Sequence, residues 1–387
     1  MSSSIEAKTH NNKKTILQVV PALVSGGVER GTIEIAKSLK ESGYNSIVIS
    51  AGGPLVSKLA QLDIKHININ VASKNPFIMC KNVGLIRDVI EEYKVDIVHA
   101  RSRAPAWSCY RATRGSRAKF ITTFHGIYNF SGLFKRYYNS VMTKGEIIIA
   151  VSNFVKQHII ENYNVAEDRI KVIYRGVDYR YFNPANITND LYLKFSEKYQ
   201  VINNIPVILL PSRMTSWKGQ MVLVEALNLI KDLDFYCLMV GDLSKHPNFT
   251  QRINDRIMKC KLQRKIQIFG NEINMIGLYG VSDIILSTSI EPEAFGRTII
   301  EAQAMEKLVI ATNIGGAAET IIDGVTGYHV EPKNAQDLAD KIRRCLSILN
   351  TEKAKQITIA ARKSVIDNFS LDLMLRKNLE IYESLLR

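Results

Sequence analysis

DIILSTSIEPEAFGRTIIEAQAM, residues 283–305, combines a strand, a turn and a helix. The first seven residues are apolar and β-branched, which predicts a buried strand, and residues 297–305 are good helix formers. Gly296 stands at the turn, where a bare backbone allows close approach and a helix N-terminus favours anion binding. Glu293 precedes the turn and Glu301 lies more than one turn into the helix. We therefore expect both carboxylates near one edge of a sheet, although a solvated surface pair is the alternative.

Strands and helices alternate on both sides of this segment, which is typical of an α/β protein. Strands separated by helices predict a parallel sheet with helices on both faces. We expect two Rossmann-like domains in tandem, each binding ligands at the carboxyl ends of its strands. The expected limits are a disordered tail at 1–14, a first domain at 15–182, a linker at 183–205, a second domain at 206–368 and a terminal helical segment at 369–387.

The composition predicts a soluble globular protein with an anionic partner. The 387 residues carry a net charge of +14, and 46% of them are hydrophobic. Such a charge favours nucleic acid, an acidic membrane face or a phosphorylated substrate. No stretch approaches the roughly 20 apolar residues of a membrane span. The polar N-terminus lacks a signal peptide, and the five scattered cysteines fit a reducing cytoplasm.

Basic residues are concentrated in one window of the predicted first domain. Acidic residues are absent between Asp96 and Glu146, whereas basic and aromatic side chains are interleaved there. We expect this window to form an acceptor and membrane face that docks on anionic lipid, although a basic surface can also serve solubility alone. The residues assigned to this face are Arg101, Arg103, Arg111, Lys135 and Arg136.

Three further motifs follow predicted strands. Gly26-Gly27 opens the first helix, where a bare backbone can contact a phosphate; a plain tight turn is the alternative. His125 ends a strand, where it can hydrogen-bond a sugar hydroxyl or simply be a structural histidine. Arg213 and Lys218 can straddle a diphosphate and offset the charge of a leaving group, or they can be an ordinary surface pair.

Two nucleotide-binding fingerprints are missing from the glycine-rich turns. SGGVERG at 25–31 is not G-x-G-x-x-G, and no G-x-x-x-x-G-K follows any strand. A dehydrogenase and an ATPase therefore have no support, and no nucleic-acid module is present. GGAAETIIDGVTG at 315–327 follows a strand, so its glycines shape the wall of a donor pocket or form ordinary turns.

Taken together, these motifs resemble the family-four retaining glycosyltransferases of GT-B fold over nearly the whole chain. Order and spacing both match in six segments, which are GGVERGTIEIAKSLKESGY at 26–44, VSNFVKQHI at 151–159, YRGVDYRYFNP at 174–184, SRMTSWKG at 212–219, the stretch 283–305, and GGAAETIIDGVTGYHVEP at 315–332. The resemblance implies two Rossmann-like domains that face each other across a cleft. It also implies a C-terminal helix that crosses back to the N-terminal domain.

The resemblance also implies roles for the matching residues. His125 and Glu293 are like the catalytic groups that contact the transferred sugar. The positions similar to the family's donor site are Gly26 and Gly27 at the phosphate, Arg213 and Lys218 at the diphosphate, Glu301 at the ribose, and Phe295, Gly296 and Arg297 along the sugar and phosphate. Ala294 stands where the family usually has proline, and Arg175 stands where it usually has asparagine.

The reaction implied by the resemblance is transfer of a hexose with retained configuration, without a metal or other cofactor. EPEAFGRTIIEAQAM is similar to enzymes of lipopolysaccharide core assembly, which are often mannosyltransferases. We therefore expect GDP-mannose as donor and an anionic glycolipid, such as the lipopolysaccharide inner core, as acceptor. The expected location is peripheral, on the cytoplasmic face of the inner membrane. A UDP-sugar and another surface glycan are the alternative; a nucleic-acid binder is favoured by charge alone.

Overall fold

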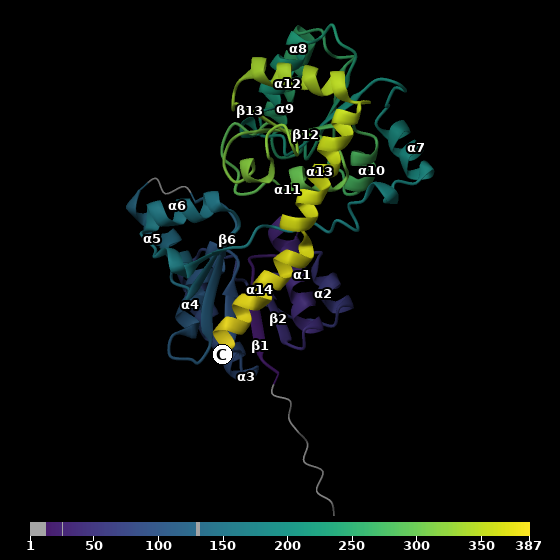
Figure 1. Cartoon of the computed structure of the whole chain (residues 1–387). Coiled ribbons are helices and arrows are strands. Elements are labelled where there is room, and N and C mark those ends of the chain that lie inside the picture. The colour runs from purple at the N-terminus through teal and green to yellow at the C-terminus, as the bar shows by residue number, and fades with distance from the viewer. Residues whose placement is uncertain (1–12, 25, 129–131) are drawn as a thin grey trace, which may run out of the picture. The chain divides into compact units, whose positions relative to one another are not determined.

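The computed structural model describes residues 13–24, 26–128 and 132–387 (Figure 1). Residues 1–12 of the expected tail lie outside the described residues. Contacts between Cα atoms divide the chain into two units. The first unit comprises the chain up to Ala150, together with His158–Val172 and Leu375–Arg387; the second comprises Val151–Gln157 and Ile173–Met374.

The first unit is built on a parallel sheet of seven strands within the described residues, in the order β3-β2-β1-β4-β5-β6-β7. Its central strands are apolar runs that are buried along their length, as expected when helices cover both faces. The strands are β1 (Thr15–Val19), β2 (Asn45–Ser50), β3 (Lys65–Asn68), β4 (Ile97–Ala100), β5 (Lys119–Phe124), β6 (Ile147–Ala150) and β7 (Ile170–Val172).

Amphipathic helices connect these strands. α1 shows the pattern, because Ile33, Ala36 and Leu39 recur at helical spacing and are buried. The exposed charged residues of this helix are Arg30, Lys37, Lys40 and Glu41. The helices between the strands of this unit are α1 (Gly27–Glu41), α2 (Val56–Gln61), α3 (Pro76–Glu92), α4 (Arg103–Thr113), α5 (Leu133–Ser140) and α6 (Asn153–Tyr163).

The second unit repeats the arrangement with six parallel strands, in the order β10-β9-β8-β11-β12-β13. Both orders follow the doubly wound pattern, in which the chain starts at the centre of the sheet and reverses direction there. The two predicted Rossmann-like halves are therefore confirmed. The strands are β8 (Val207–Pro211), β9 (Tyr236–Val240), β10 (Ile266–Phe269), β11 (Ile284–Ser287), β12 (Leu308–Thr312) and β13 (Tyr328–Val330).

The helices of the second unit enclose one apolar core. Ile208, Leu227, Ile253 and Ile342 come from different elements, and all four are fully buried in this core. The helices are α7 (Asn189–Lys198), α8 (Gln220–Leu229), α9 (Pro247–Lys259), α10 (Met275–Gly280), α11 (Arg297–Ala304), α12 (Ala335–Ile348) and α13 (Glu352–Asn368).

The segment expected as a linker is instead a folded part of the second unit. Thr188 caps α7 by accepting a hydrogen bond from Leu191 N at 3.2 Å. Phe195 of α7 is 4% exposed and packs so closely on α10 that a Cβ at Gly277 would lie 2.5 Å from its ring. Asparagine and proline in 183–205 therefore form caps and a short turn rather than a flexible connection.

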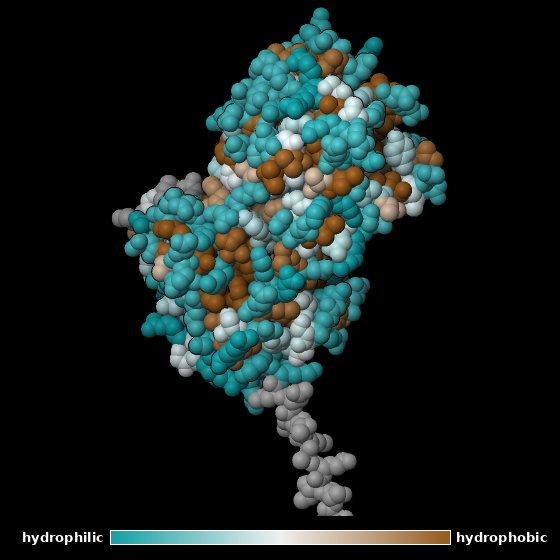
Figure 2. Space-filling model, viewed as in Figure 1, coloured by the Kyte–Doolittle hydropathy of each residue, from teal (hydrophilic) through white to brown (hydrophobic). Residues whose placement is uncertain are grey.

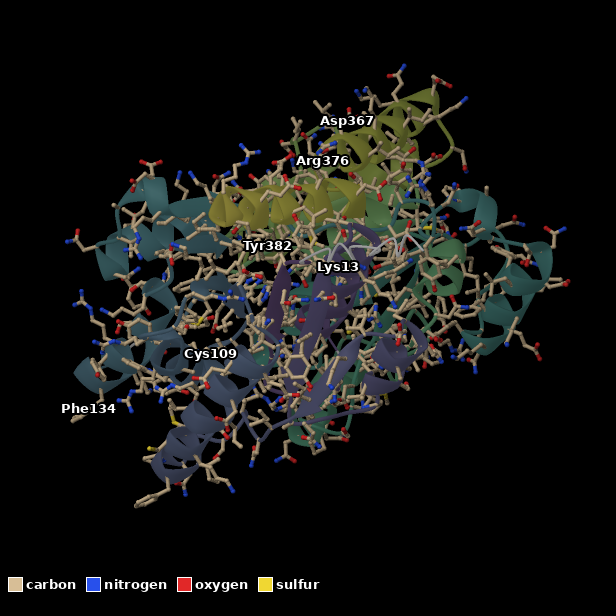
Figure 3. All side chains as sticks on the ribbon, turned by 90° about the horizontal axis from the view of Figure 1, so that it is seen from below. Lys13, Cys109, Phe134, Asp367, Arg376 and Tyr382 are labelled. Carbon is tan, nitrogen blue, oxygen red and sulfur yellow. The ribbon has the colours of Figure 1, made fainter. Side chains whose placement is uncertain are left out.

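The last helix, α14 (Leu371–Leu386), contributes its C-terminal part to the first unit. Its Tyr382 is fully buried beneath the helix (Figure 3). The Tyr382 hydroxyl lies 2.8 Å from Nδ1 of His99, whose Nε2 lies 2.7 Å from the Thr123 hydroxyl. This buried chain of hydrogen bonds fixes the C-terminus of the protein on β4 and β5.

Candidate active site

The candidate site lies at the carboxyl end of the second sheet. β8, β11 and β12 are neighbours in this sheet, so the segments that follow them emerge side by side. Arg213 and Lys218 follow β8, Glu293 follows β11, and Gly315 follows β12. Because ligands of open α/β sheets bind at this edge, the structure collects the predicted donor-site residues of the second unit where a ligand is expected.

Gly219 joins the first two of these segments. A Cβ at this position would lie 1.8 Å from the carbonyl oxygen of Thr288, and its φ is +77°. The Thr288 hydroxyl in turn donates a hydrogen bond to the carbonyl oxygen of Lys218 at 2.9 Å. Glycine suits this position for two reasons, because it tolerates a positive φ and because it leaves room for the Thr288 backbone.

Lys218 and Glu293 meet as an ion pair. The Lys218 Nζ lies 2.7 Å from Oε1 of Glu293, and the two side chains are 14% and 16% exposed. The hydroxyl of Ser289, which is 2% exposed, also donates to Oε1 of Glu293. Sequence reasoning missed Ser289, because a serine four residues before a glutamate carries no signal of its own.

The Trp217 ring makes cation–π contacts with both predicted diphosphate-binding side chains. The Arg213 guanidinium carbon lies 5.2 Å from the Trp217 ring centroid, and the Lys218 Nζ lies 4.5 Å from it. Burial lowers the pKa of Lys218 and the charge of Arg213 lowers it further, while Glu293 opposes both effects. Two cations beside one ring therefore form a site that favours an incoming anion.

Glu301 is held in a largely buried position by two donors. The Tyr279 hydroxyl donates to its Oε2 at 3.1 Å, and Arg297 Nη2 lies 3.4 Å from its Oε1. Burial raises the pKa of Tyr279, and the adjacent Glu301 charge raises it further. Tyr279 therefore acts as a neutral hydrogen-bond donor that orients the carboxylate. It was missed because it lies 22 residues before its partner.

Gly315 and Gly316 open a GG-x-x-E motif at residues 315–319, and they pack against the backbone of the Glu293 loop. A Cβ at Gly315 would lie 2.6 Å from the Glu293 carbonyl oxygen, and one at Gly316 would lie 2.1 Å from that of Ala294. Gly316 N donates to the Glu293 carbonyl oxygen at 2.7 Å. These glycines therefore position the backbone that carries Glu293.

Glu319, the acid of the same motif, caps α6, whose first turn belongs to the second unit. Its carboxylate accepts hydrogen bonds from the backbone nitrogens of Asn153 at 2.9 Å and Phe154 at 2.6 Å, and from the Tyr174 hydroxyl at 2.9 Å. A carboxylate at a helix N-terminus is favourable because it meets unpaired N–H groups and the positive end of the helix dipole. This role was also missed, since the partners are 166 residues apart in the chain.

Three residues at the start of α11 were predicted to line the sugar and phosphate of the donor. Gly296 is the N-cap residue, and Arg297 begins the helix. The Phe295 side chain is only 7% exposed, and its ring lies 5.9 Å from those of Tyr174 and Phe369. Its side chain therefore belongs to an aromatic cluster, and the expectation that this residue lines the sugar stays a prediction.

The predicted residues of the first unit lie at the carboxyl edge of their own sheet. Gly26 caps α1 with a φ of +126°, and Gly27 is the first residue of that helix. His125 follows β5 directly and is half-buried. Since β1 and β5 both flank β4, the structure brings these three residues to one edge of the first unit.

One member of the predicted basic face is buried and a second is half-buried. Arg101 is 4% exposed, and a Cβ at Gly31 would lie 3.3 Å from its Nη2. Arg103 stacks on Tyr128 at 4.1 Å from the ring centroid and donates to Asn139 Oδ1 at 2.8 Å. The assignment of Arg101 to a membrane face is therefore wrong, whereas that of the half-buried Arg103 stays a prediction. Exposed members of the face are Arg111, Lys135 and Arg136.

Two features are absent from the described residues, a metal-binding cluster and a membrane-spanning helix. No group of three or more histidine, cysteine, aspartate or glutamate side chains is arranged to hold a metal ion in the described part of the chain. None of the described helices combines the length and the apolar character needed to cross a membrane.

Comparison with known families gives two consecutive matches. Residues 25–181 match the model for Glycosyltransferase Family 4, and residues 194–364 match the model for Glycosyl transferases group 1. Together these matches cover most of both units.

Similar proteins agree with these matches. A solved glycosyltransferase from Rickettsia africae ESF-5 is 64% identical, with a TM-score of 0.92, over 97% of this chain and 99% of that one. Anabaena Alr3699/HepE, solved with UDP and glucose, is 23% identical, with a TM-score of 0.82, over 96% and 100%. N-acetyl-alpha-D-glucosaminyl L-malate synthase of Bacillus anthracis is 24% identical over 95% and 96%.

Proposed function

Because the chain belongs to the GT-B glycosyltransferases, with a family 4 domain followed by a group 1 domain, we propose that it transfers a hexose with retained configuration. The donor is a nucleoside diphosphate sugar, and the acceptor supplies a hydroxyl. The observation that carries this proposal is the grouping of Arg213, Lys218 and Glu293 at one sheet edge of the second unit. Two cations suit a diphosphate, and a carboxylate suits sugar hydroxyls.

Each side chain has a separate task in this reaction. Arg213 and Lys218 offset the negative charge that develops on the leaving diphosphate. Glu293 orients the sugar, and Glu301 accepts hydrogen bonds from the ribose. As the acceptor oxygen bonds to the anomeric carbon, the bond from that carbon to the diphosphate breaks, and the leaving phosphate takes the hydroxyl proton. No metal or other cofactor takes part in this scheme.

Three of the remaining predicted residues belong to the first unit, and Arg297 belongs to the second. The backbone at Gly26 and Gly27 approaches the donor phosphate, and His125 hydrogen-bonds a hydroxyl of the transferred sugar. Gly26 supports this role because its bare, left-handed backbone precedes a helix N-terminus. Arg297 contributes a further cation to the donor; its Nε is buried without a hydrogen-bond partner, which is unfavourable until an acceptor arrives.

A UDP-sugar is the donor that the relatives support. The Anabaena neighbour was solved with UDP and glucose, and the Bacillus anthracis relative is named for an N-acetylglucosaminyl product. We therefore place UDP-glucose and UDP-N-acetylglucosamine first. GDP-mannose is the second candidate, because residues 291–305 resemble mannosyltransferases of lipopolysaccharide core assembly.

An anionic glycolipid, such as the lipopolysaccharide inner core, is the proposed acceptor. It implies a peripheral location on the cytoplasmic face of the inner membrane. The support is electrostatic. The chain carries a net charge of +14, and Arg111, Lys135 and Arg136 are exposed in a window without acidic residues. A basic surface of this kind is attracted to lipid phosphates over roughly one Debye length.

Thermal unfolding in the presence of single nucleotide sugars tests the donor. A ligand at about 100 times its dissociation constant stabilises the folded state by about 2.7 kcal/mol. We expect a rise in melting temperature with one nucleotide family and a smaller rise in Lys218→Ala. Release of the nucleoside diphosphate in the presence of a glycolipid extract then tests transfer. If no nucleotide sugar stabilises the protein or is consumed, the proposal fails.

A further inference from the structure

Two phenylalanine side chains of the first unit are almost fully exposed. Phe134 of α5 is 91% exposed and Phe77 in the first turn of α3 is 86% exposed, more than any other large apolar side chain among the described residues. Figure 3 shows Phe134 at the outer margin of the unit, pointing away from it. One exposed apolar side chain is ordinary, but two aromatic rings at this exposure indicate a surface with a partner.

α4 fixes the two segments that carry these rings. The Ser108 hydroxyl donates to the carbonyl oxygen of Met79, in the first turns of α3, at 3.1 Å. The adjacent Trp107 stacks on Tyr137 of α5 with ring centroids 5.1 Å apart, and its Nε1 donates to the Tyr138 carbonyl oxygen at 2.9 Å. The start of α3 and the second half of α5 are therefore anchored to successive residues of one helix.

Both rings have basic residues as close neighbours in the sequence. Phe77 lies in residues 64–87 and Phe134 in residues 97–145, and neither stretch contains an acidic residue. Figure 2 shows apolar side chains reaching the surface of this unit among hydrophilic ones. We call the exposed set the α3–α5 surface, which consists of Lys74, Phe77, Lys81, Phe134, Lys135 and Arg136.

We infer that the α3–α5 surface inserts Phe77 and Phe134 into the interfacial region of an anionic bilayer. Aromatic rings bury in the boundary between headgroups and acyl chains, while lysine and arginine beside them pair with lipid phosphates. Charge complementarity selects the membrane, because this surface lacks the carboxylates that would repel it. The inference deepens the proposed peripheral location but does not depend on sugar transfer.

Vesicle sedimentation with the full chain tests this inference. The wild type is expected to bind phosphatidylcholine vesicles that contain phosphatidylglycerol, and to bind pure phosphatidylcholine weakly. Phe77→Ser and Phe134→Ser should each lower the partition coefficient roughly tenfold, as expected for losing the burial of one aromatic ring. Ile273→Ser is the matched control, since Ile273 is 81% exposed in the second unit; it should bind like wild type.

A second experiment measures directly whether the side chain at position 134 inserts into the bilayer. In Phe134→Trp, we expect brominated lipid acyl chains to quench an additional component of tryptophan fluorescence over that of the wild type. Lys135→Glu with Arg136→Glu should remove binding to anionic vesicles. Equal binding by wild type and both serine variants would overturn the inference. So would self-association or single-stranded DNA binding that depends on the two phenylalanines in the absence of vesicle binding.

The two proposals fail in different ways. If the surface serves the membrane, both serine variants keep the thermal shift produced by the nucleotide sugar, because neither phenylalanine is among the residues proposed to contact the donor. Vesicle binding by a protein that consumes no nucleotide sugar would leave this inference standing and reject the proposed reaction. A donor-dependent thermal shift without vesicle binding would do the reverse.

Discussion

Lys218 Nζ lies 2.7 Å from Oε1 of Glu293, so the cation expected to grip a diphosphate is already paired with the acid expected to orient the sugar. The two side chains are mostly buried, and breaking such a pair by removing one partner leaves the other charge poorly compensated. A nucleotide sugar can satisfy both at once, because its phosphates bind the lysine while its hydroxyls donate to the glutamate. Donor binding in this scheme exchanges one ion pair for two ligand contacts.

Removal of either partner should therefore stop the reaction without unfolding the protein. We expect Lys218→Ala and Glu293→Gln to reduce turnover by roughly 10²–10³-fold, the range for losing one group that stabilises a transition-state charge. Release of nucleoside diphosphate measures the effect, and thermal unfolding tests that the fold persists. Lys245→Ala is the control, because Lys245 pairs with Asp242 on the surface of the same unit. Full activity in either site variant would contradict the assignment.

The pH dependence of donor binding should report the protonation of Lys218. Burial and the Arg213 charge lower the pKa of Lys218 below the ordinary lysine value. Its positive charge is therefore lost at a lower pH than that of a surface lysine, and donor affinity should fall as pH rises through that pKa. Calorimetric titration at increasing pH measures the fall. Lys218→Arg, which stays charged throughout, should abolish it; an unchanged alkaline profile would argue against this role.

Tyr279 should act by orienting Glu301 and not by contacting the reacting groups. In Tyr279→Phe the ring stays buried, but the hydrogen bond to Glu301 Oε2 is lost. Hydrogen bonds to charged groups are worth about 1.5–3 kcal/mol, so we expect KM for the donor to rise roughly tenfold or more while kcat changes less. Steady-state kinetics with varied donor separates the two constants. An equal loss in kcat with unchanged KM would instead place Tyr279 in the chemical step.

The GG-x-x-E glycines should control the loop that carries Glu293. In Gly316→Ala the new Cβ would meet the Ala294 carbonyl oxygen at 2.1 Å, so the backbone has to move. We expect a lower melting temperature and a large loss of turnover. Gly270→Ala is the matched control in the same unit, because no atom lies within 4 Å of a Cβ there. If Gly316→Ala keeps wild-type turnover, the loop does not depend on this contact.

Local patterns in the sequence were sufficient to predict most of the fold. Alternating apolar runs and amphipathic stretches predicted both sheets, because parallel sheets leave that signature in every strand. One available signal was overlooked. α3 begins at Pro76, with Asn75 Oδ1 accepting a hydrogen bond from Phe77 N at 2.9 Å. Asparagine followed by proline is a recognisable helix start.

Contacts between distant segments could not be predicted in the same way. Arg101 is charged and lies in a basic window, yet it is buried. Composition alone does not reveal which side chains turn inward at the end of a strand. Glu319 was part of a recognised motif, but its capping of α6 depends on residues far away in the chain. Such pairings are set by the tertiary fold. Residue patterns therefore predicted which segments form the candidate site, but not the hydrogen bonds and ion pairs between their side chains.

The buried pair of His99 and Tyr382 should make the first unit sensitive to mild acid. Burial holds the pKa of His99 well below its ordinary value, and the charge of Arg101 lowers it further. The unfolded chain takes up the proton at about pH 6.5, whereas the folded protein resists it. Stability is therefore present above that pH and falls as pH decreases below it, by up to about 1.4 kcal/mol per pH unit.

Thermal unfolding at about pH 7.5 and about pH 5.5, on either side of the ordinary histidine pKa, tests this prediction in wild type and His99→Asn. We expect the variant to be less stable at both values, because the hydrogen bonds to Tyr382 and Thr123 are lost, but to lose less between them. His66, His158 and His329 also have lowered pKa values because of burial. They are present in both proteins, so the difference between the two pH responses isolates His99. Identical responses would mean that His99 is not protonated on unfolding in this range.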